Sequence, residues 1–239
     1  MNRLVKYLAA ASKPAFWPAI ARGVMPEVEH IEAIRRLNRK TLIDVGANKG
    51  QFSLVARFSF PEIEIHAFEP LEPERTLLNT ILGPPARVYP WALSNASDEA
   101  DFFVTSRHDS SSLLVPGSGQ KAAYGVELES VCRVQRRKLA EVIEASRLRK
   151  PILLKLDVQG GEIEVLKGAG TALAEIEFIY CEASFVRLYE AQPLIGQITD
   201  FLRSFGFSLS GVFNQSTTNV FGPTEADILF QKSRGEICG

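Results

Sequence analysis

Two ionisable residues interrupt an otherwise apolar stretch of the sequence, residues 151–158. Lys155 and Asp157 stand there among isoleucine, leucine and valine residues. Burying a charged side chain is costly unless it is paired or faces a cleft. We therefore take Lys155 and Asp157 as the best polar candidates for chemistry in the chain. A purely structural pair between Lys155 and a carboxylate is the alternative.

A second candidate site follows residues 42–45, which are apolar except for Asp44. Gly46 and Gly50 come directly after this stretch and before a segment that looks helical, so the pattern predicts a strand, a glycine turn and the start of a helix. Glycine allows a ligand to approach the backbone closely, and the free N–H groups at the helix start favour anionic or electron-rich groups. The turn therefore indicates a small-molecule site, although glycine turns are also purely structural.

A carboxylate follows the next predicted strand. Glu69 lies 69 − 46 = 23 residues after Gly46, close to the roughly 20-residue offset at which an acid binds the ribose of a nucleoside cofactor. A carboxylate suits two vicinal hydroxyl donors because it offers two acceptor oxygens. A solvated glutamate at the end of a strand is the alternative. Taken with the glycine turn, Glu69 favours the ribose interpretation.

The elements that position these residues alternate between strands and helices. Strands are predicted at residues 42–45, 63–68, 87–93, 151–158, 177–182, 207–212 and 226–230. This alternation predicts an α/β fold with a doubly wound, mostly parallel sheet. Because parallel strands end at one edge of such a sheet, four acids should line a single crevice. They are Asp44, Glu69, Asp157 and Glu182.

The domain organisation predicted is a helical N-terminal extension, residues 1–38, before a domain of residues 39–239. An insertion at about residues 98–138 breaks the alternation, with hairpin-type strands at 101–105 and 130–136. Its serine- and glycine-rich part, residues 110–120, is either a functional lid or a mobile loop.

The N-terminal extension has three possible roles. Its short helices pack against the domain, cover the cleft as a lid, or make a weak membrane-surface contact through Arg3, Lys6, Phe16 and Trp17.

Composition excludes some classes of protein. With 27 basic and 28 acidic residues the formal charge is −1, so no basic excess attracts nucleic acid. Cys132, Cys181 and Cys238 lack the paired spacing of a zinc site, and we expect reduced thiols in a cytoplasmic protein. No apolar run approaches the ~20 residues that span a bilayer.

In combination, seven segments of the chain resemble the FkbM family of S-adenosylmethionine-dependent methyltransferases. They are residues 44–53 (DVGANKGQFS), 68–70 (FEP), 92–95 (ALSN), 111–113 (SSL), 155–162 (KLDVQGGE), 166–169 (LKGA) and 227–230 (DILF). Departures from the family pattern are modest: a proline displaced to Pro73, Gly161 in place of a slightly larger residue, and Asp98-Glu99 in place of a turn glycine.

The resemblance implies a Rossmann-like class I methyltransferase sheet of seven strands in the order 3-2-1-4-5-7-6, with the last strand antiparallel. It also implies methyl transfer from S-adenosyl-L-methionine to a hydroxyl of a small-molecule acceptor, a sugar, polyketide or other metabolite. Asp157 is our choice for the base at this hydroxyl, followed by Lys155, Glu182 and His108. The cofactor-binding residues expected are Asp44, Gly46, Ala47, Asn48, Gly50, Phe52, Glu69, Pro70, Ala92, Leu93 and Asp157.

Other functions remain as alternatives. A nicotinamide-dependent oxidoreductase would show G-x-G-x-x-G, which fails because Asn48 and Gln51 occupy two of the glycine positions. A catalytically silent nucleoside-binding or scaffold protein can use the same fold. We expect no metal site, although Asp157 and Glu182 are the pair that would hold a divalent ion.

Overall fold

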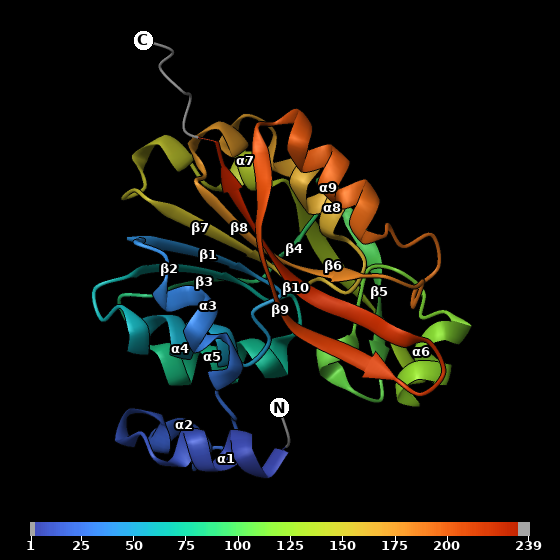
Figure 1. Cartoon of the computed structure of the whole chain (residues 1–239), viewed down its shortest axis with the longest axis horizontal. Helices are drawn as coiled ribbons and strands as arrows, with labels where there is room; N and C mark the ends of the chain where they lie inside the picture. Colours follow the sequence, from blue (N-terminus) through green and yellow to red (C-terminus); the bar gives the residue numbers. More distant parts are fainter. Residues whose placement is uncertain (1–2, 234–239) are drawn as a thin grey trace.

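A seven-stranded sheet forms the centre of the computed structural model, which describes residues 3–233 (Figure 1). Its strands are β1 (Thr41–Val45), β2 (Glu64–Phe68), β3 (Arg87–Tyr89), β7 (Ile152–Leu156), β8 (Phe178–Ser184), β9 (Phe207–Thr218) and β10 (Gly222–Lys232). They are arranged in the order β3-β2-β1-β7-β8-β10-β9, and β10 runs antiparallel to β8. Numbered within this sheet alone, the order is 3-2-1-4-5-7-6, as predicted.

Helices cover both faces of the sheet because neighbouring strand residues point to opposite sides. Ile43 of β1 belongs to the hydrophobic cluster under α8 (Glu162–Ala169) and α9 (Ile195–Ser204). Leu42 belongs to the cluster under α4 (Gln51–Ser59) and α5 (Glu72–Leu82). These two helices follow β1 and β2, as the sequence pattern predicts. The fold is therefore the α/β class expected, with its polar strand ends at one edge.

The prediction of a single strand at residues 87–93 is wrong, because two separate strands lie there. β3 ends at Tyr89, and β4 (Ala92–Leu93) pairs in parallel with β6 (Leu128–Arg137) in a separate three-stranded sheet. Pro90 has no backbone N–H to continue the ladder, and the chain leaves the main sheet there. The insertion is a hairpin, as expected: β5 (Glu99–Thr105) pairs antiparallel with β6.

The two strands at the C-terminal side are longer than the sequence pattern predicts. β9 and β10 form a hairpin that reaches beyond the main sheet towards α6 (Ser118–Tyr124) (Figure 1). Tyr124 of α6 donates a hydrogen bond of 2.7 Å to Glu225 of β10. α6 itself was not expected, because Gly117 just before it and Gly119 in its first turn suggest a loop.

The segment 110–120 packs on the rest of the chain. Ser110, Ser111 and Ser112 are all buried, and Ser112 Oγ donates a hydrogen bond of 2.8 Å to the carbonyl oxygen of Gln159. The segment thus covers the turn that follows β7, which is where a lid would lie. Its movement remains a prediction.

If residues 110–120 open to admit ligands, their backbone amides should exchange with solvent at least about tenfold more slowly once the cavity is filled, since lids belong to the least stable parts of a fold. Hydrogen exchange with and without S-adenosylhomocysteine measures this, and the amides of α9 serve as the internal control. If the exchange rates of the amides in residues 110–120 are the same with and without S-adenosylhomocysteine, the segment is an ordinary packed loop.

The N-terminal region consists of short helices: α1 (Arg3–Ala11), a 3-10 turn (Pro14–Phe16), α2 (Trp17–Ile20), a second 3-10 turn (Val28–His30) and α3 (Ile31–Arg35). Phe16 is buried with its ring 4.9 Å from that of Phe58, and Lys6 forms an ion pair with Glu29. Phe16 and Lys6 are therefore engaged within the chain, and Trp17 is exposed. Two of the four residues proposed to contact a membrane surface thus have partners within the chain, and the contact itself remains a prediction.

Cys132 and Cys181 are free thiols, and Cys238 lies outside the described residues. Between residues 3 and 233, every helix is too short or too polar to cross a membrane.

Candidate active site

The glycine turn brings β1 against the end of β7. Gly46 has φ +74°, and a Cβ added there would lie 1.8 Å from the backbone oxygen of Asp157. Only glycine fits this close approach without displacing the neighbouring strand. The turn continues through Asn48, which also has a positive φ, to Gly50 at the start of α4. Backbone N–H groups of the turn therefore stand beside the carboxyl ends of two strands.

Glu69 lies at the end of β2 and faces this turn. Its Oε2 accepts a hydrogen bond of 2.9 Å from the backbone N–H of Asn48, and its Oε1 accepts one of 2.8 Å from that of Leu71. Burial raises the pKa of Glu69 to about 7, although both backbone bonds act in the opposite direction. Each carboxylate oxygen keeps a further lone pair. Glu69 can thus accept two more hydrogen bonds from a bound molecule.

A cavity lies between the turn, Glu69 and the small sheet, and we call it the turn cavity. Nine of the predicted cofactor-binding residues line it: Gly46, Ala47, Asn48, Phe52, Glu69, Pro70, Ala92, Leu93 and Asp157. Gly50 and Asp44 lie outside its lining. Gly50 instead packs against Leu78, which a Cβ would approach to 2.8 Å. Trp91 and Asn95 also line the cavity and were not singled out from the sequence.

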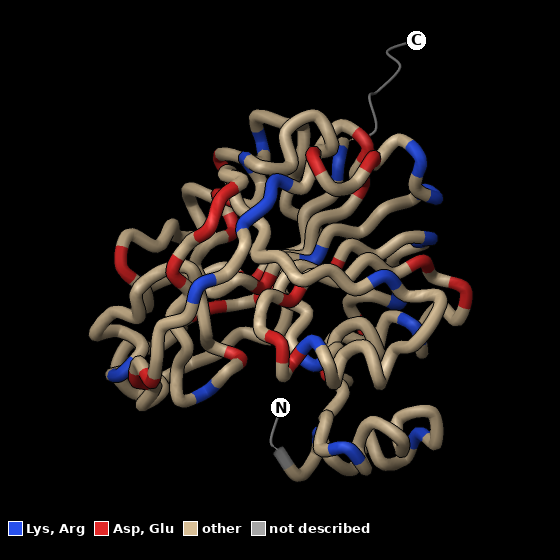
Figure 2. The backbone as a smooth tube through the Cα atoms, turned by 180° about the vertical axis from the view of Figure 1, so that it is seen from behind, with Lys and Arg blue, Asp and Glu red and all other residues tan. Residues whose placement is uncertain are grey.

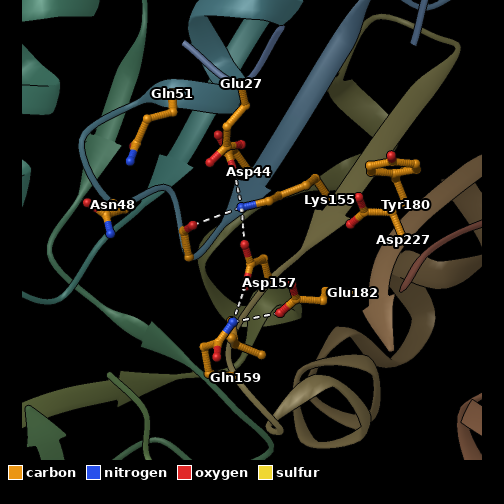
Figure 3. A network of polar contacts seen from close by, with 12 residues as sticks. Glu27, Asp44, Asn48, Gln51, Lys155, Asp157, Gln159, Tyr180, Glu182 and Asp227 are labelled. Atoms are coloured by element: carbon orange, nitrogen blue, oxygen red, sulfur yellow. Dashed lines mark hydrogen bonds and ion pairs between the residues drawn. The ribbon is translucent and has the colours of Figure 1, made fainter. Parts of the chain in front are cut away.

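Asp44 is fully buried behind the turn cavity. Its carboxylate accepts a hydrogen bond of 2.6 Å from Ser53 and lies 3.2 Å from Lys155 Nζ. The same ammonium donates a hydrogen bond of 2.8 Å to the carbonyl oxygen of Gly46 and lies 3.7 Å from Asp157 (Figure 3). Asp44 therefore contacts Lys155 behind the cavity wall, and its direct contact with a cofactor stays a prediction.

Lys155 is held as a cation. Burial alone would lower its pKa, but the carboxylates of Asp44 and Asp157 outweigh burial and raise the pKa above its usual value. A protonated amine cannot accept a proton, so Lys155 is a poor base and a good anchor for Asp157. Lys155 thus forms the structural pair with a carboxylate that was considered from the sequence, and the same ammonium also holds the candidate base Asp157.

Asp157 is joined to Glu182 through an amide that was not singled out from the sequence. Gln159 Nε2 donates a hydrogen bond of 2.8 Å to Asp157 and one of 2.6 Å to Glu182 (Figure 3). Burial, and then repulsion from Asp157, raise the pKa of Glu182 well above its usual value. Gln159 adopts a positive φ of 56° in the turn after β7, and this conformation aims its amide between the two acids.

A second cavity opens on the other side of Asp157, and we call it the acidic chamber. It has a volume of about 620 Å³, and Lys155, Asp157 and Gln159 line it as well as the turn cavity. Its carboxylates are those of Glu27, Glu29, Asp109, Asp157, Glu182, Glu225 and Asp227, and its cationic or basic residues are His30, Arg107 and Lys155. Figure 2 shows acidic positions gathered near the middle of the molecule.

The N-terminal region contributes Glu27 and His30 to this chamber, 3.4 Å apart, and His30 also lies 3.4 Å from Asp227. Burial alone would raise the pKa of Glu27, but His30 and Lys155 outweigh it and lower this pKa to about 2. Sequence reasoning missed both residues because they precede the recognisable motifs by more than ten positions.

His108 is placed differently from the other predicted catalytic residues. It lines the turn cavity but not the acidic chamber, and its Nδ1 lies 2.7 Å from the carboxylate of Glu74. The structure thus brings Asp157, Lys155 and Glu182 together and leaves His108 apart. Within residues 3–233, no group of three or more His, Cys, Asp and Glu side chains is arranged to hold a metal ion.

The sequence model of a protein family, the methyltransferase FkbM domain, matches residues 44–209 of this chain. This chain belongs to the FkbM methyltransferase family. Its cofactor is therefore S-adenosylmethionine, and it is a methyltransferase rather than a nicotinamide-dependent enzyme. The turn cavity fits that cofactor: Glu69 has free lone pairs for the ribose, and Asn48 Oδ1 is buried without a hydrogen-bond partner among the described residues.

Three relatives are similar to this FkbM protein. It is 29% identical over 203 residues to the AMB antimetabolite synthetase AmbE of Pseudomonas aeruginosa, covering 71% of this chain but 10% of AmbE. The 2-O-methyltransferase NoeI of Sinorhizobium fredii is 24% identical over 213 residues, with 85% of each chain covered. The hexuronic acid methyltransferase AglP of Haloferax volcanii is 28% identical over 145 residues, covering 59% of this chain and 54% of AglP. The chain thus spans a small part of AmbE and about half of AglP.

The FkbM model ends at residue 209 and begins at residue 44, so much of the acidic chamber lies outside it. Glu27, His30, Asn214, Glu225 and Asp227 all line the chamber and fall beyond these limits. The turn cavity, by contrast, is lined mainly from within the matched range.

Replacing Glu69 tests its predicted contact with the ribose. Glu69→Ala should weaken S-adenosylhomocysteine binding by roughly 1–3 kcal/mol, the cost of losing charge-assisted hydrogen bonds. Since the pKa of Glu69 is about 7, the carboxylate is protonated below this pH and offers fewer acceptors, so the affinity should fall as the pH decreases through about 7. In Glu69→Gln, calorimetry should find this dependence reduced; an unchanged affinity and pH profile in both variants would remove Glu69 from the ribose site.

Proposed function

We propose that this methyltransferase transfers a methyl group to a hydroxyl of a sugar or another small hydroxylated metabolite. The observation that carries the proposal is the position of Asp157, which lines both the turn cavity and the acidic chamber. The name of NoeI refers to methylation of an oxygen, and that of AglP to hexuronic acid, a sugar acid. These names support a hydroxylated acceptor without identifying it.

The roles of the residues follow from this position. When bound, S-adenosylmethionine supplies an electrophilic methyl group on a sulfonium, so alignment of the acceptor oxygen accounts for much of the rate. Asp157 accepts the hydrogen bond of the acceptor hydroxyl and takes up its proton as the oxygen attacks. Gln159 holds Oδ1 of Asp157, and Lys155 lies beside Oδ2, so the carboxylate has a fixed orientation.

Glu182 is a second possible proton acceptor in the proposal. Burial and the charge of Asp157 raise its pKa, which makes it a stronger base than an exposed glutamate, and the neutral amide of Gln159 links it to Asp157. We assign the main role to Asp157 because Glu182 lines the acidic chamber and lies outside the lining of the turn cavity.

A product assay tests the proposal. The full chain is incubated with S-adenosylmethionine labelled in the methyl group and with sugars and hydroxylated metabolites, and the labelled products are identified by mass spectrometry. We expect methyl ethers, which survive mild alkali. Label found only in alkali-labile methyl esters or on nitrogen would contradict transfer to a hydroxyl. Cofactor binding without any transfer would favour the silent binding protein.

A further inference from the structure

Two carboxylates of the acidic chamber, Glu182 and Glu225, form no ion pair within residues 3–233. Glu182 accepts its hydrogen bond from the neutral amide of Gln159, and Glu225 accepts one from the hydroxyl of Tyr124. Glu182 also lies directly opposite Asp227 in the pairing of β8 with β10, where like charges destabilise a sheet. These acids therefore remain available to a positively charged ligand.

The basic residues of the chamber are already engaged. Lys155 is held by Asp44 and Asp157, and His30 lies between Glu27 and Asp227. Arg107 lies 3.3 Å from Asp109, with about half of its side chain exposed. None of these three described cations is placed to neutralise Glu182 or Glu225 by an ion pair.

An independent observation concerns Gln120, which lines the chamber and is 1% exposed. Its Oε1 is buried without a hydrogen-bond partner among residues 3–233. Its Nε2 donates to the hydroxyl of Tyr189, whose other neighbours are acceptors, the backbone oxygen of Ser110 at 2.7 Å and Gln159 Oε1 at 2.8 Å. Tyr189 has one proton and already faces two acceptors, so Gln120 must present its N–H₂ to it. The unpartnered atom is therefore the acceptor oxygen.

A second unpartnered acceptor lies on the N-terminal side of the chamber. Glu29 Oε1 forms an ion pair of 2.6 Å with Lys6, while Glu29 Oε2 is buried and has no hydrogen-bond partner in the described part of the chain. Glu29 also lines the chamber. A buried acceptor without a donor is unfavourable because its desolvation is not offset, and a ligand with N–H groups supplies the missing donor.

We propose that the acceptor carries a protonated amine, bound in the acidic chamber, next to the hydroxyl that is methylated. The inference rests on the proposed function and names the substrate class of the same site. An ammonium group has three N–H donors and no acceptor, which matches the carboxylates of Glu182 and Glu225 and the unpartnered oxygens of the chamber. An acceptor with a carboxylate, such as a hexuronic acid, would meet Glu182, Glu225 and Asp227 and be repelled.

Three sugars that differ in charge test this inference: glucosamine, glucose and glucuronate, each titrated at pH 7 into the full chain saturated with S-adenosylhomocysteine. Glucosamine should bind at least about tenfold more tightly than glucose, the effect of one favourable ion pair of about 1.4 kcal/mol, and glucuronate more weakly than glucose. Equal affinities, tighter binding of glucose or glucuronate, or no detectable binding of any of the three would overturn the inference.

Variants locate the effect. Glu225→Gln should lower the affinity for glucosamine about tenfold and alter that for glucose less than about threefold. Asp200→Asn, an exposed acid on α9 that pairs with Arg203, is the control and should leave all affinities unchanged. If Glu225→Gln does not fold, the comparison of the three sugars on the unaltered chain still decides the question. An equal loss for glucosamine and glucose in Glu225→Gln would contradict recognition of charge.

These measurements separate the inference from the proposed function, because S-adenosylhomocysteine has no methyl group to transfer. Methylation of neutral sugars together with equal binding of all three sugars would support the proposed function and contradict the inference that the acceptor carries an amine. Preferential binding of glucosamine without methyl transfer to any hydroxylated amine would support amine binding in the acidic chamber and contradict the proposed methyl transfer to a hydroxyl.

Discussion

Asp157→Asn is expected to lower the turnover of methyl transfer by about 10²–10⁴-fold, the usual contribution of a general base, while leaving cofactor affinity nearly unchanged. Asparagine has almost the same shape, and its carbonyl oxygen can still accept the hydrogen bond of 2.8 Å from Gln159. It cannot take up the acceptor's proton. The loss should therefore appear in kcat rather than in the binding of S-adenosylhomocysteine.

Glu182→Gln is the comparison for Asp157→Asn. The hydrogen bond from Gln159 to Glu182 can be kept by the amide oxygen, and Glu182 lies outside the lining of the turn cavity. Its loss in turnover should be smaller than that of Asp157→Asn. Full activity of Asp157→Asn would make Asp157 structural and move the role of base to Glu182 or His108, or leave alignment alone to account for the rate.

Gly46→Ala is expected to have the largest effect on stability. Its Cβ would lie 1.8 Å from the backbone oxygen of Asp157, and φ at this residue is +74°. Strain of the left-handed conformation costs about 1–2 kcal/mol, and overpacking against backbone adds roughly 1–3 kcal/mol. We expect the free energy of unfolding to fall by about 2–5 kcal/mol, with loss of cofactor binding, because β1 and β7 must move apart.

Gly23→Ala is the matched control for this substitution. Gly23 has φ +76°, and a Cβ added there has nothing within 4 Å. It therefore carries the conformational strain without the clash, and chemical denaturation should show a loss of about 1–2 kcal/mol. Equal losses in Gly46→Ala and Gly23→Ala would mean that the close approach to Asp157 contributes nothing.

The main sheet was predictable because each of its strands carries a local signal. Residues 152–156 are buried on both faces, and apart from Lys155 they are a continuous apolar run in the sequence. The break after Tyr89 was less visible, since a proline in a short apolar stretch does not say where the chain goes next. The pairing of Ala92 with Arg136 depends on residues more than forty positions apart.

The site was predictable where its residues lie in one motif. Lys155 and Asp157 were found because charges in an apolar strand are unusual, and Glu69 by its distance from the glycine turn. The acidic chamber was not found, since Glu27 and Asp227 come from segments about 200 residues apart that meet only in the folded chain. Nor does the sequence tell that Asp44 lies behind the cavity rather than in its wall.

A crystal structure of the chain with S-adenosylhomocysteine tests the central claim most directly. We predict that the ribose hydroxyls lie within hydrogen-bond distance of Glu69 in the turn cavity, and that the sulfur faces Asp157 and the opening of the acidic chamber. A ribose bound away from Glu69, or a sulfur that points away from Asp157, would contradict the account.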